Sequence, residues 1–509
     1  MLRNAWKPIT AAVAIGGPAY VYYTSRSDRY QTFNLPVKVK GADGRPEMTT
    51  RAIPLLPMEQ LEARIREHAI ENIHSGSTGP VWRFTTAALS SNDPIEDANA
   101  HQVIQRDESD PSAPGDYLFF AVMDGHSGRD TSQLLSRVLI KAVALELSNL
   151  VTDPNAQPNA GIMQRVYSVL GSSPAQKAQA FLDAHPLRVS RAIEDAFTKL
   201  DTELISAPIQ VLANNLDAEA RKNKVIPDLS QHPLAMTAML PAISGDSRAV
   251  AGVWEKTPDG KGQWRVEVLS EDQTGRNPNE LKRLQSEHPK DEADYVVREG
   301  RILGGLEPSR AFGDARYKWP RAVQETLSQA FLVGNGRPLR SPPALFKTPP
   351  YVTARPVVTH RKFDFPSNPE SYSPGAPRFL VLATDGLWDE LSSEDVVSLV
   401  GGHLSGLKGT IPKSDLSAIV PTSIGHAGVD GKKKRKEDTS GSWAFTDDNV
   451  SAHLIRNAFG GGDEKRLRQL LSIPAPYSRR YRDDITVTVV MWEDGKEDAA
   501  QVTTIKSKL

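Results

Sequence analysis

The sequence predicts an α+β protein with antiparallel sheets, built as one large domain. Many short apolar runs are bounded by turn residues, which is typical of buried strands. Segments with the apolar spacing of helices lie between these runs, but without the regular alternation of a doubly wound parallel fold. Segments rich in Pro, Ala, Ser and Gln interrupt this pattern at several places. We therefore expect insertions into one domain rather than a chain of separate domains.

The composition is that of an ordinary globular protein and excludes several kinds of chemistry. Hydrophobic residues make up 39% of the 509 residues and charged residues 24%. The net charge of −1 gives no general reason to expect nucleic-acid binding. The absence of cysteine excludes disulfides, zinc–thiolate sites, iron–sulfur clusters and cysteine nucleophiles.

Helices and strands are expected in a mixed order along the chain. Apolar spacing predicts the following helices: Met58–Glu67, Thr131–Asn149, Leu187–Ile205 and a helix from Asn277 to about His288. Strand patterns occupy the following segments: Val81–Phe84, Ala235–Leu240, Ala249–Val253 and Trp264–Leu269. Asn277 as N-cap, Pro278 at the first helical position and Glu280 predict a capping box.

The predicted boundaries divide the chain into four parts. They are a targeting segment with a short apolar stretch (1–27), an N-terminal extension (28–80), the main domain (81–495) and a tail (496–509). Insertions into the main domain are expected at about residues 151–187, 333–377 and 405–442.

The N-terminal segment is basic and free of acidic residues, which is typical of a mitochondrial presequence. Residues 1–27 contain Arg3, Lys7 and Arg26. The apolar run over residues 9–23 is shorter than the roughly 20 residues that a spanning helix needs, and Gly16-Gly-Pro18 weakens it further. Membrane association through this run, a secretory signal and an ordinary tail remain open alternatives.

The C-terminal tripeptide Ser507, Lys508 and Leu509 matches the address read by the peroxisomal import receptor. The two ends together predict a mitochondrial protein, in the matrix, the inner membrane or the intermembrane space. Dual targeting to peroxisomes is part of this prediction.

Three apolar runs meet carboxylates at one end. Tyr117-Leu-Phe-Phe-Ala-Val-Met leads into Asp124-Gly-His, and Phe379-Leu-Val-Leu-Ala-Thr leads into Asp385-Gly. In the third case the acids come first: Asp483 and Asp484 precede the apolar run Ile485-Thr-Val-Thr-Val-Val-Met-Trp492. A carboxylate at the end of a buried strand is costly to desolvate, and a divalent cation is its usual partner. A single Asp-Gly pair is more often only a turn, but three such sites favour convergence on hard metals.

Six motifs in order resemble the metal-dependent Ser/Thr protein phosphatases of type 2C, over about residues 80–492. The motifs are Pro-Ile-Glu96-Asp97, Met-Asp124-Gly-His-Ser-Gly, Gly-Asp246-Ser-Arg, Ser309-Arg-Ala-Phe-Gly-Asp314, Ala-Thr-Asp385-Gly-Leu-Trp-Asp389 and Arg482-Asp-Asp-Ile-Thr-Val. Within the family, segments such as Asn277-Pro-Asn-Glu-Leu and Thr348-Pro-Pro-Tyr resemble the catalytic subunit of pyruvate dehydrogenase phosphatase. The resemblance implies a sandwich of two antiparallel sheets flanked by helices.

The resemblance also implies hydrolysis of phosphoserine or phosphothreonine in proteins. Water between two Mg²⁺ or Mn²⁺ ions would attack phosphorus without a covalent enzyme intermediate. By resemblance, the metal ligands are Asp97, Asp124, the backbone carbonyl of Gly125, Asp385 and Asp483. Glu96 is expected to hold metal-bound water, Asp246 and Asp389 to bind a third metal, and His126 to act as general acid.

One position departs from the family pattern. Many members have an arginine that grips the substrate phosphate four residues before the Glu of the Glu-Asp pair, where this chain has Asn92. The pyruvate dehydrogenase phosphatase branch also lacks this arginine, so its absence favours that branch. It also predicts a weaker grip on phosphate, to which Arg310 or Arg482 could contribute.

The leading substrate hypothesis is the E1 component of the pyruvate dehydrogenase complex. Two alternatives stay open at this point. The same chemistry could act on a different membrane or peroxisomal phosphoprotein, or the chain could be an inactive metal-binding scaffold.

Overall fold

The structure is a computed structural model of the 509-residue chain. The residues that it describes are 31–40, 45–75, 81–104, 116–152, 185–232, 242–335, 342–362, 377–429 and 440–493. Residues 9–23, the predicted strand Ala235–Leu240 and the tripeptide Ser507–Leu509 lie outside these ranges.

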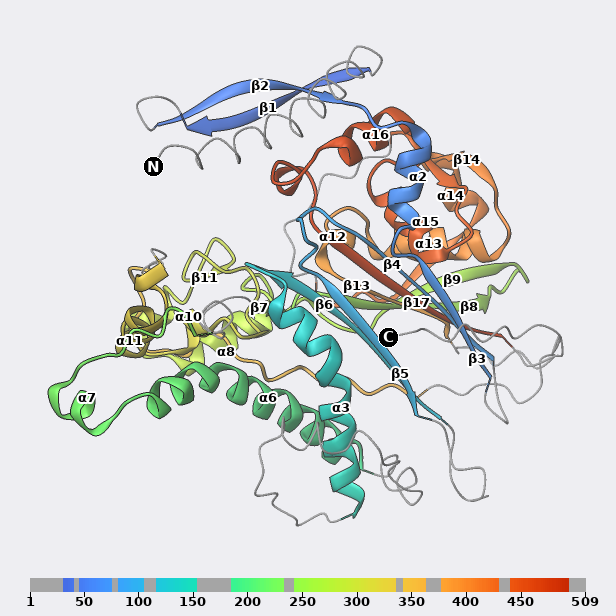
Figure 1. Cartoon of the computed structure of the whole chain (residues 1–509). Coiled ribbons are helices and arrows are strands. Elements are labelled where there is room, and N and C mark those ends of the chain that lie inside the picture. The colour runs from blue at the N-terminus through green and yellow to red at the C-terminus, as the bar shows by residue number, and fades with distance from the viewer. Residues whose placement is uncertain are drawn as a thin grey trace.

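Two sheets form the centre of the molecule (Figure 1). The larger sheet has the order β15-β9-β8-β13-β17-β4-β3 and is antiparallel except for the pair β15 and β9. Its strands are β3 Ile70–Ser75, β4 Val81–Leu89, β8 Arg248–Lys256, β9 Gly262–Val268, β13 Pro377–Ala383, β15 Thr422–His426 and β17 Ile485–Glu493. The smaller antiparallel sheet, in the order β12-β7-β6-β5, consists of β5 Ala98–Ile104, β6 Tyr117–His126, β7 Ala242–Ser244 and β12 Ala311–Phe312.

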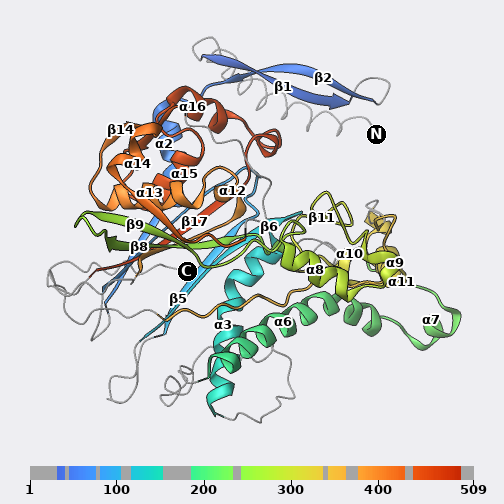
Figure 2. The same ribbon diagram turned by 180° about the vertical axis from the view of Figure 1, so that it is seen from behind.

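Helices cover the outer faces of the two sheets, as the two opposite views show (Figures 1 and 2). The larger sheet packs against α2 Met58–Arg66, α13 Ser393–Leu404 and α15 Val450–Ala458. The smaller sheet packs against α3 Asp130–Thr152, which in turn packs on α6 Pro186–Asn214. Between the sheets, the rings of Phe84 and Phe120 meet edge to face with centroids 5.1 Å apart. The predicted α+β class with two largely antiparallel sheets is therefore confirmed.

Further elements surround this sandwich. A hairpin of β1 Thr32–Lys40 and β2 Pro46–Pro54 stands apart from it in both views. On the side of the smaller sheet lie α7 Ala218–Asn223, α8 Pro278–Glu287, α9 Lys290–Ala293, α10 Ala315–Lys318, α11 Arg321–Phe331, η1 Val333–Asn335 and the β10 Val297–Arg298/β11 Arg301–Ile302 pair. On the other side lie α12 Asp385–Trp388, α14 Lys413–Ile419, α16 Glu464–Ser472, η2 Ser478–Arg480 and the β14 Gly409–Pro412/β16 Ser442–Phe445 pair.

The four predicted helices are present, but the expected capping box of α8 is wrong. Asn277 caps the helix by accepting a hydrogen bond from the backbone N–H of Asn279. The Glu280 carboxylate does not turn back to the cap, because it accepts hydrogen bonds from Arg283, Ser309 and Arg310. Two guanidinium groups are stronger partners for a carboxylate than a single backbone N–H group.

The expected N-terminal extension and one expected insertion contribute to the larger sheet and to the helices that cover it. Residues 28–80 supply α2, whose Leu61 and Ile65 are fully buried, and strand β3. Residues 405–442 supply β15 at the opposite edge. The domain boundaries themselves stay predictions. Within the described ranges, no helix is both long and apolar enough to cross a membrane.

Candidate metal centre

The antiparallel register brings the predicted acidic residues to one end of the sandwich. Strand β6 carries Asp124 shortly before its end at His126, and strand β13 ends at the same place, just before Asp385. Strands β5 and β17 begin at the same end, just after Asp97 and Asp484. The pairs Ala98 with Met123 and Ala383 with Val487 fix these positions. Residues far apart in sequence therefore meet because neighbouring strands run in opposite directions.

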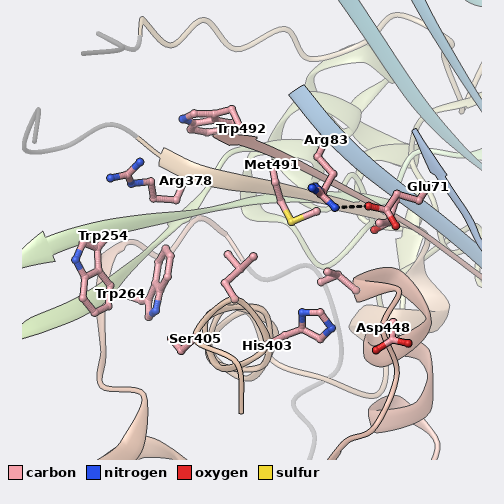
Figure 3. Close-up of a pocket in the computed structure, with 13 residues that line it drawn as sticks. Glu71, Arg83, Trp254, Trp264, Arg378, His403, Ser405, Asp448, Met491 and Trp492 are labelled. Carbon is pink, nitrogen blue, oxygen red and sulfur yellow. Dashed lines mark hydrogen bonds and ion pairs between the residues drawn. The ribbon is translucent and has the colours of Figure 1, made fainter. Parts of the chain in front are cut away.

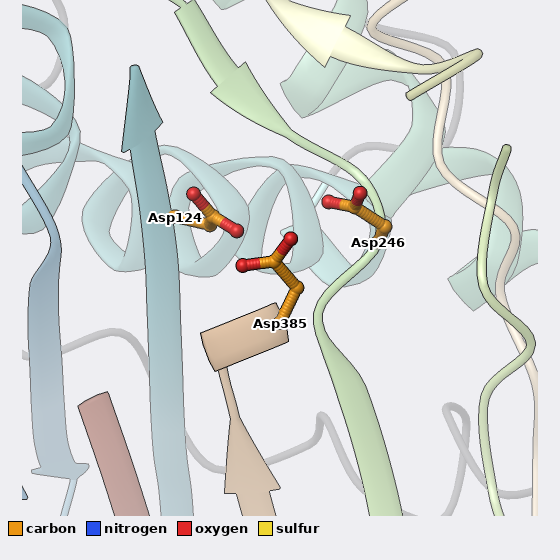
Figure 4. Close-up of side chains that lie close together, drawn as sticks. All are labelled: Asp124, Asp246 and Asp385. Carbon is orange, nitrogen blue, oxygen red and sulfur yellow. The ribbon is translucent and has the colours of Figure 1, made fainter. Parts of the chain in front are cut away.

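Three carboxylates point toward one another at this end (Figure 4). Asp124 lies on β6, Asp246 lies between β7 and β8, and Asp385 begins α12. One oxygen of each lies within 4.8 Å of the others, and Asp124 and Asp246 are buried. This arrangement of carboxylate oxygens fits a hard divalent cation.

Asp97 and Asp483 border this cluster with different partners. Asp97 is buried and accepts hydrogen bonds from the Thr384 hydroxyl at 2.8 Å and the Gly125 N–H at 3.3 Å. Asp483 is partly exposed and pairs with the guanidinium of Arg479. The four predicted carboxylate ligands are thus gathered at one site, together with Asp246.

Burial and mutual repulsion disfavour the charged forms of the carboxylates in this site. Burial raises the pKa of the Asp124 carboxyl well above its usual range, and repulsion from Asp385, Asp97, Asp246 and Asp483 raises it further. Burial and the charges of Asp484 and Asp385 likewise raise the pKa of Asp97, against hydrogen bonds from threonine hydroxyls. Such a group of acids is stabilised in its charged form by cations.

Two glycines allow the strand ends to approach this closely. A Cβ atom at Gly125 would lie 2.1 Å from the carbonyl oxygen of Glu96. A Cβ atom at Gly386 would lie 2.1 Å from the carbonyl oxygen of Asp484. Any side chain would push these backbones apart, so both Asp-Gly pairs have a structural reason for their glycine.

The loop before Asp97 is held by Asp484, a residue outside the predicted set of ligands. The buried Asp484 carboxylate accepts hydrogen bonds from the backbone N–H groups of Ser91, Asn92 and Glu96, at 2.5, 2.9 and 2.8 Å. The Asn92 amide donates to both Asp484 and Glu96 at 3.0 Å. Asn92 therefore ties the loop together at the position where other family members are expected to grip phosphate.

Glu96 and Asp389 lie beside the three-carboxylate cluster rather than in it. Burial raises the pKa of the Glu96 carboxyl, a backbone N–H bond from Gly128 opposes this, and the Asp484 charge adds to it. Asp389 follows α12, and its backbone N–H donates to the carbonyl of Asp385 at 2.7 Å.

His126 forms a pair with Asp314, a second residue outside the predicted set. Its Nε2 lies 3.4 Å from Asp314 Oδ1. Burial alone would lower the pKa of His126, but the hydrogen bond and charge of Asp314, with Asp246 and Glu96, outweigh burial and raise it. The left-handed backbone of Asp314, with φ of 45°, helps to present its carboxylate there. A pattern search could not find this pair because 188 residues separate its members.

A separate groove of about 650 Å³ lies between the larger sheet and the end of α13 (Figure 3). Its lining includes Trp254, Trp264, Arg378 and Trp492. None of the predicted metal ligands or His126 lines it. The acid cluster, not this groove, is therefore the candidate site.

Comparison with known proteins shows the family to which the chain belongs. The profile of the protein phosphatase 2C family matches residues 91–414. A protein phosphatase 2C homologue of Schizosaccharomyces pombe is 34% identical over 432 residues, which cover 81% of each chain. The mitochondrial pyruvate dehydrogenase (acetyl-transferring) phosphatase 1 of Saccharomyces cerevisiae is 34% identical over 87% of this chain and 74% of its own. The human mitochondrial pyruvate dehydrogenase phosphatase 2 is 32% identical over 85% and 82%, respectively.

Among solved structures, a serine-threonine phosphatase 2C from Toxoplasma gondii aligns with 91% of this chain and all of its own. Its TM-score of 0.33 and identity of 16% are too low to bear on the fold. The family match and the identities over most of the chain are decisive. The chain belongs to the protein phosphatase 2C family of metal-dependent protein serine/threonine phosphatases.

Proposed function

We propose that the acid cluster holds the divalent cations of this phosphatase, two Mg²⁺ or Mn²⁺ ions, with room for a third. The residues that would hold the two ions are Asp97, Asp124, the Gly125 carbonyl, Asp385 and Asp483. The observation that carries this proposal is that one carboxylate oxygen each of Asp124, Asp246 and Asp385 lies within 4.8 Å of the others. Bound cations would lower the pKa of water and neutralise charge on the phosphoryl group.

The remaining predicted residues would act around these ions. Glu96 is proposed to orient water from the loop that Asp484 holds. Asp246 and Asp389 are proposed for a third ion. The contact of Asp246 with Asp124 and Asp385 supports a direct part for Asp246.

His126 is proposed as the general acid that protonates the departing serine or threonine oxygen. It is partly exposed, which leaves it accessible to a substrate, and Asp314 stabilises its protonated form. An imidazolium poised near neutral pH suits this transfer.

The proposed substrate is the E1 component of a pyruvate dehydrogenase complex in mitochondria. The support is the identity of 34% and 32% to two mitochondrial phosphatases whose names give this substrate. Residues 9–23 and Ser507–Leu509 lie outside the described ranges, so membrane association and the peroxisomal address stay predictions.

Phosphate release from a phosphoserine peptide tests the metal site. We expect the full chain to release phosphate with Mn²⁺ or Mg²⁺ and to stop when a chelator is added. Asp124→Ala should lower the rate by at least about a hundredfold, since it removes a ligand and the bound metal's chemistry.

Asp291→Ala is the matched control, because the Asp291 side chain is 76% exposed and its ion-pair partner among the described residues is the surface Lys347. It should retain normal turnover. Undiminished turnover of Asp124→Ala would refute the assignment. A folded wild-type chain that binds Mn²⁺ without turning over would favour the scaffold alternative.

A further inference from the structure

An arginine outside the predicted motifs stands at the edge of the acid cluster. Arg479 lies on η2, one turn before Asp483, and its Nη1 pairs with the Asp483 carboxylate. Its charge also acts on Asp385, Asp484 and Glu96. With 42% of its side chain exposed, the guanidinium borders both the acids and the solvent.

The arginines within the six motifs bind internal partners and not the acid cluster. Arg248 forms a bidentate pair with the fully buried Asp272. Arg310 forms a bidentate pair with Glu280, at 3.1 and 2.7 Å. Arg482 is buried and donates to the carbonyls of Ser90 and Leu470. Arg310 and Arg482, the two expected helpers in phosphate binding, are therefore held by internal partners.

Asp483 is the acceptor of the Arg479 ion pair in the described part of the chain, and it is also a proposed metal ligand. A carboxylate that binds a divalent cation gives up much of its attraction for a neighbouring guanidinium. The planar guanidinium then matches the oxygens of a phosphoryl group, which it can bind through two parallel hydrogen bonds.

We propose that Arg479 binds the phosphoryl group of the substrate, exchanging Asp483 for phosphate oxygens when the metal site is filled. This role rests on the proposed metal site. Arg479 supplies from η2 the grip that Asn92 cannot supply, because the neutral Asn92 amide is engaged with Glu96 and Asp484.

The proposal predicts changes of opposite sign in two binding reactions. Without Arg479, phosphate loses a charged partner and binds more weakly. The metal loses a competitor for Asp483 and binds as tightly as before or more tightly. If Arg479 served only to hold Asp483 in position, its removal would weaken metal binding instead.

The test compares the full chain with Arg479→Ala, Arg479→Lys and the control Arg480→Ala. Arg480 is the exposed neighbour, and it forms no ion pair with the described residues. Mn²⁺ affinity is measured by calorimetry without substrate. The inhibition constant of inorganic phosphate and the KM and kcat for a phosphoserine peptide are measured at saturating Mn²⁺.

We expect Arg479→Ala to raise KM and the phosphate inhibition constant roughly tenfold or more, with Mn²⁺ affinity undiminished. Arg479→Lys should recover only part of this loss, since ammonium lacks the bidentate geometry. Arg480→Ala should match the wild type in all three measurements.

An unchanged phosphate inhibition constant in Arg479→Ala would overturn the proposal. So would a parallel loss of Mn²⁺ and phosphate affinity, which would make Arg479 a support for Asp483. Failure of the wild-type chain to bind Mn²⁺ would instead refute the metal site, and with it the basis of this role.

Discussion

At the scale of single residues, two neighbouring acids at the start of β17 have separate tasks. Asp483 faces the acid cluster, whereas Asp484 turns to the loop before Asp97 and accepts three backbone hydrogen bonds. Adjacent side chains at the start of a strand point in opposite directions, which accounts for the division. The sequence shows two acids, and only the structure shows which one organises the loop.

The role of His126 can be tested through the leaving group. Removal of a general acid should matter most where the departing oxygen is strongly basic, as in phosphoserine. We expect His126→Ala to slow release from a phosphoserine peptide by about a hundredfold or more, and release from p-nitrophenyl phosphate far less.

His426→Ala is the matched control, because His426 is exposed on β15, the edge strand of the larger sheet that pairs with β9. It should leave both rates unchanged. Equal losses on the two substrates in His126→Ala would count against proton donation.

At the scale of elements, α2 joins the N-terminal segment to the body of the molecule. Leu61 and Ile65 are buried in the main core, and Glu62 pairs with Arg456 of α15. Arg456 also pairs with the buried Asp447. A buried guanidinium between two carboxylates fixes the position of α2 against α15.

Leu61→Ala should destabilise the protein by about 2–5 kcal/mol, because it removes a fully buried side chain and leaves a cavity. Urea unfolding of the full chain measures this free energy. Gln60→Ala, at an exposed position of the same helix, should change stability by less than about 0.5 kcal/mol. A harmless Leu61→Ala would mean that α2 does not belong to the cooperative core.

At the scale of the whole molecule, one buried carboxylate joins α8 to the segment that carries Asp314. Burial would raise the pKa of Glu280, but hydrogen bonds from Arg283, Arg310 and Ser309 outweigh it and lower the pKa to about 2. Arg310 lies four residues before Asp314 and also donates to the Arg355 carbonyl. This cluster therefore supports the partner of His126 from outside the metal centre.

The pH dependence of stability follows from this lowered pKa. Relative to the ordinary value of 4.5, Glu280 contributes about 3 kcal/mol above pH 4.5, and this contribution is lost as the pH falls toward 2. Glu280→Gln should lower stability at pH 7 and flatten the loss on acidification, as measured by urea unfolding from pH 7 to pH 3.

Glu287→Gln is the control, since Glu287 pairs with the same Arg283 but is 49% exposed. Its effect should stay below about 1 kcal/mol at every pH. An acid dependence of Glu280→Gln identical to that of the wild type would contradict the strong Glu280 pairing.

The sequence by itself determined the α+β class, the main helices and the acids at strand ends. These depend on local patterns: apolar periodicity for the elements, and Asp-Gly pairs after apolar runs for the acids. The resemblance to type 2C phosphatases followed from the same short motifs, and the family comparison confirms it.

The tertiary structure decided which partners these residues have. It places Asp246 next to Asp124 and Asp385, and it pairs Asp314 with His126. Asp484 accepts hydrogen bonds from the loop before Asp97. Arg310 and Arg482 form internal hydrogen bonds instead of facing the acid cluster. The tertiary structure also draws Glu280 away from its helix cap. Each of these contacts joins segments that are far apart in sequence. Strand register and packing decide whether such segments meet in space, and a local pattern of side chains carries no information about that.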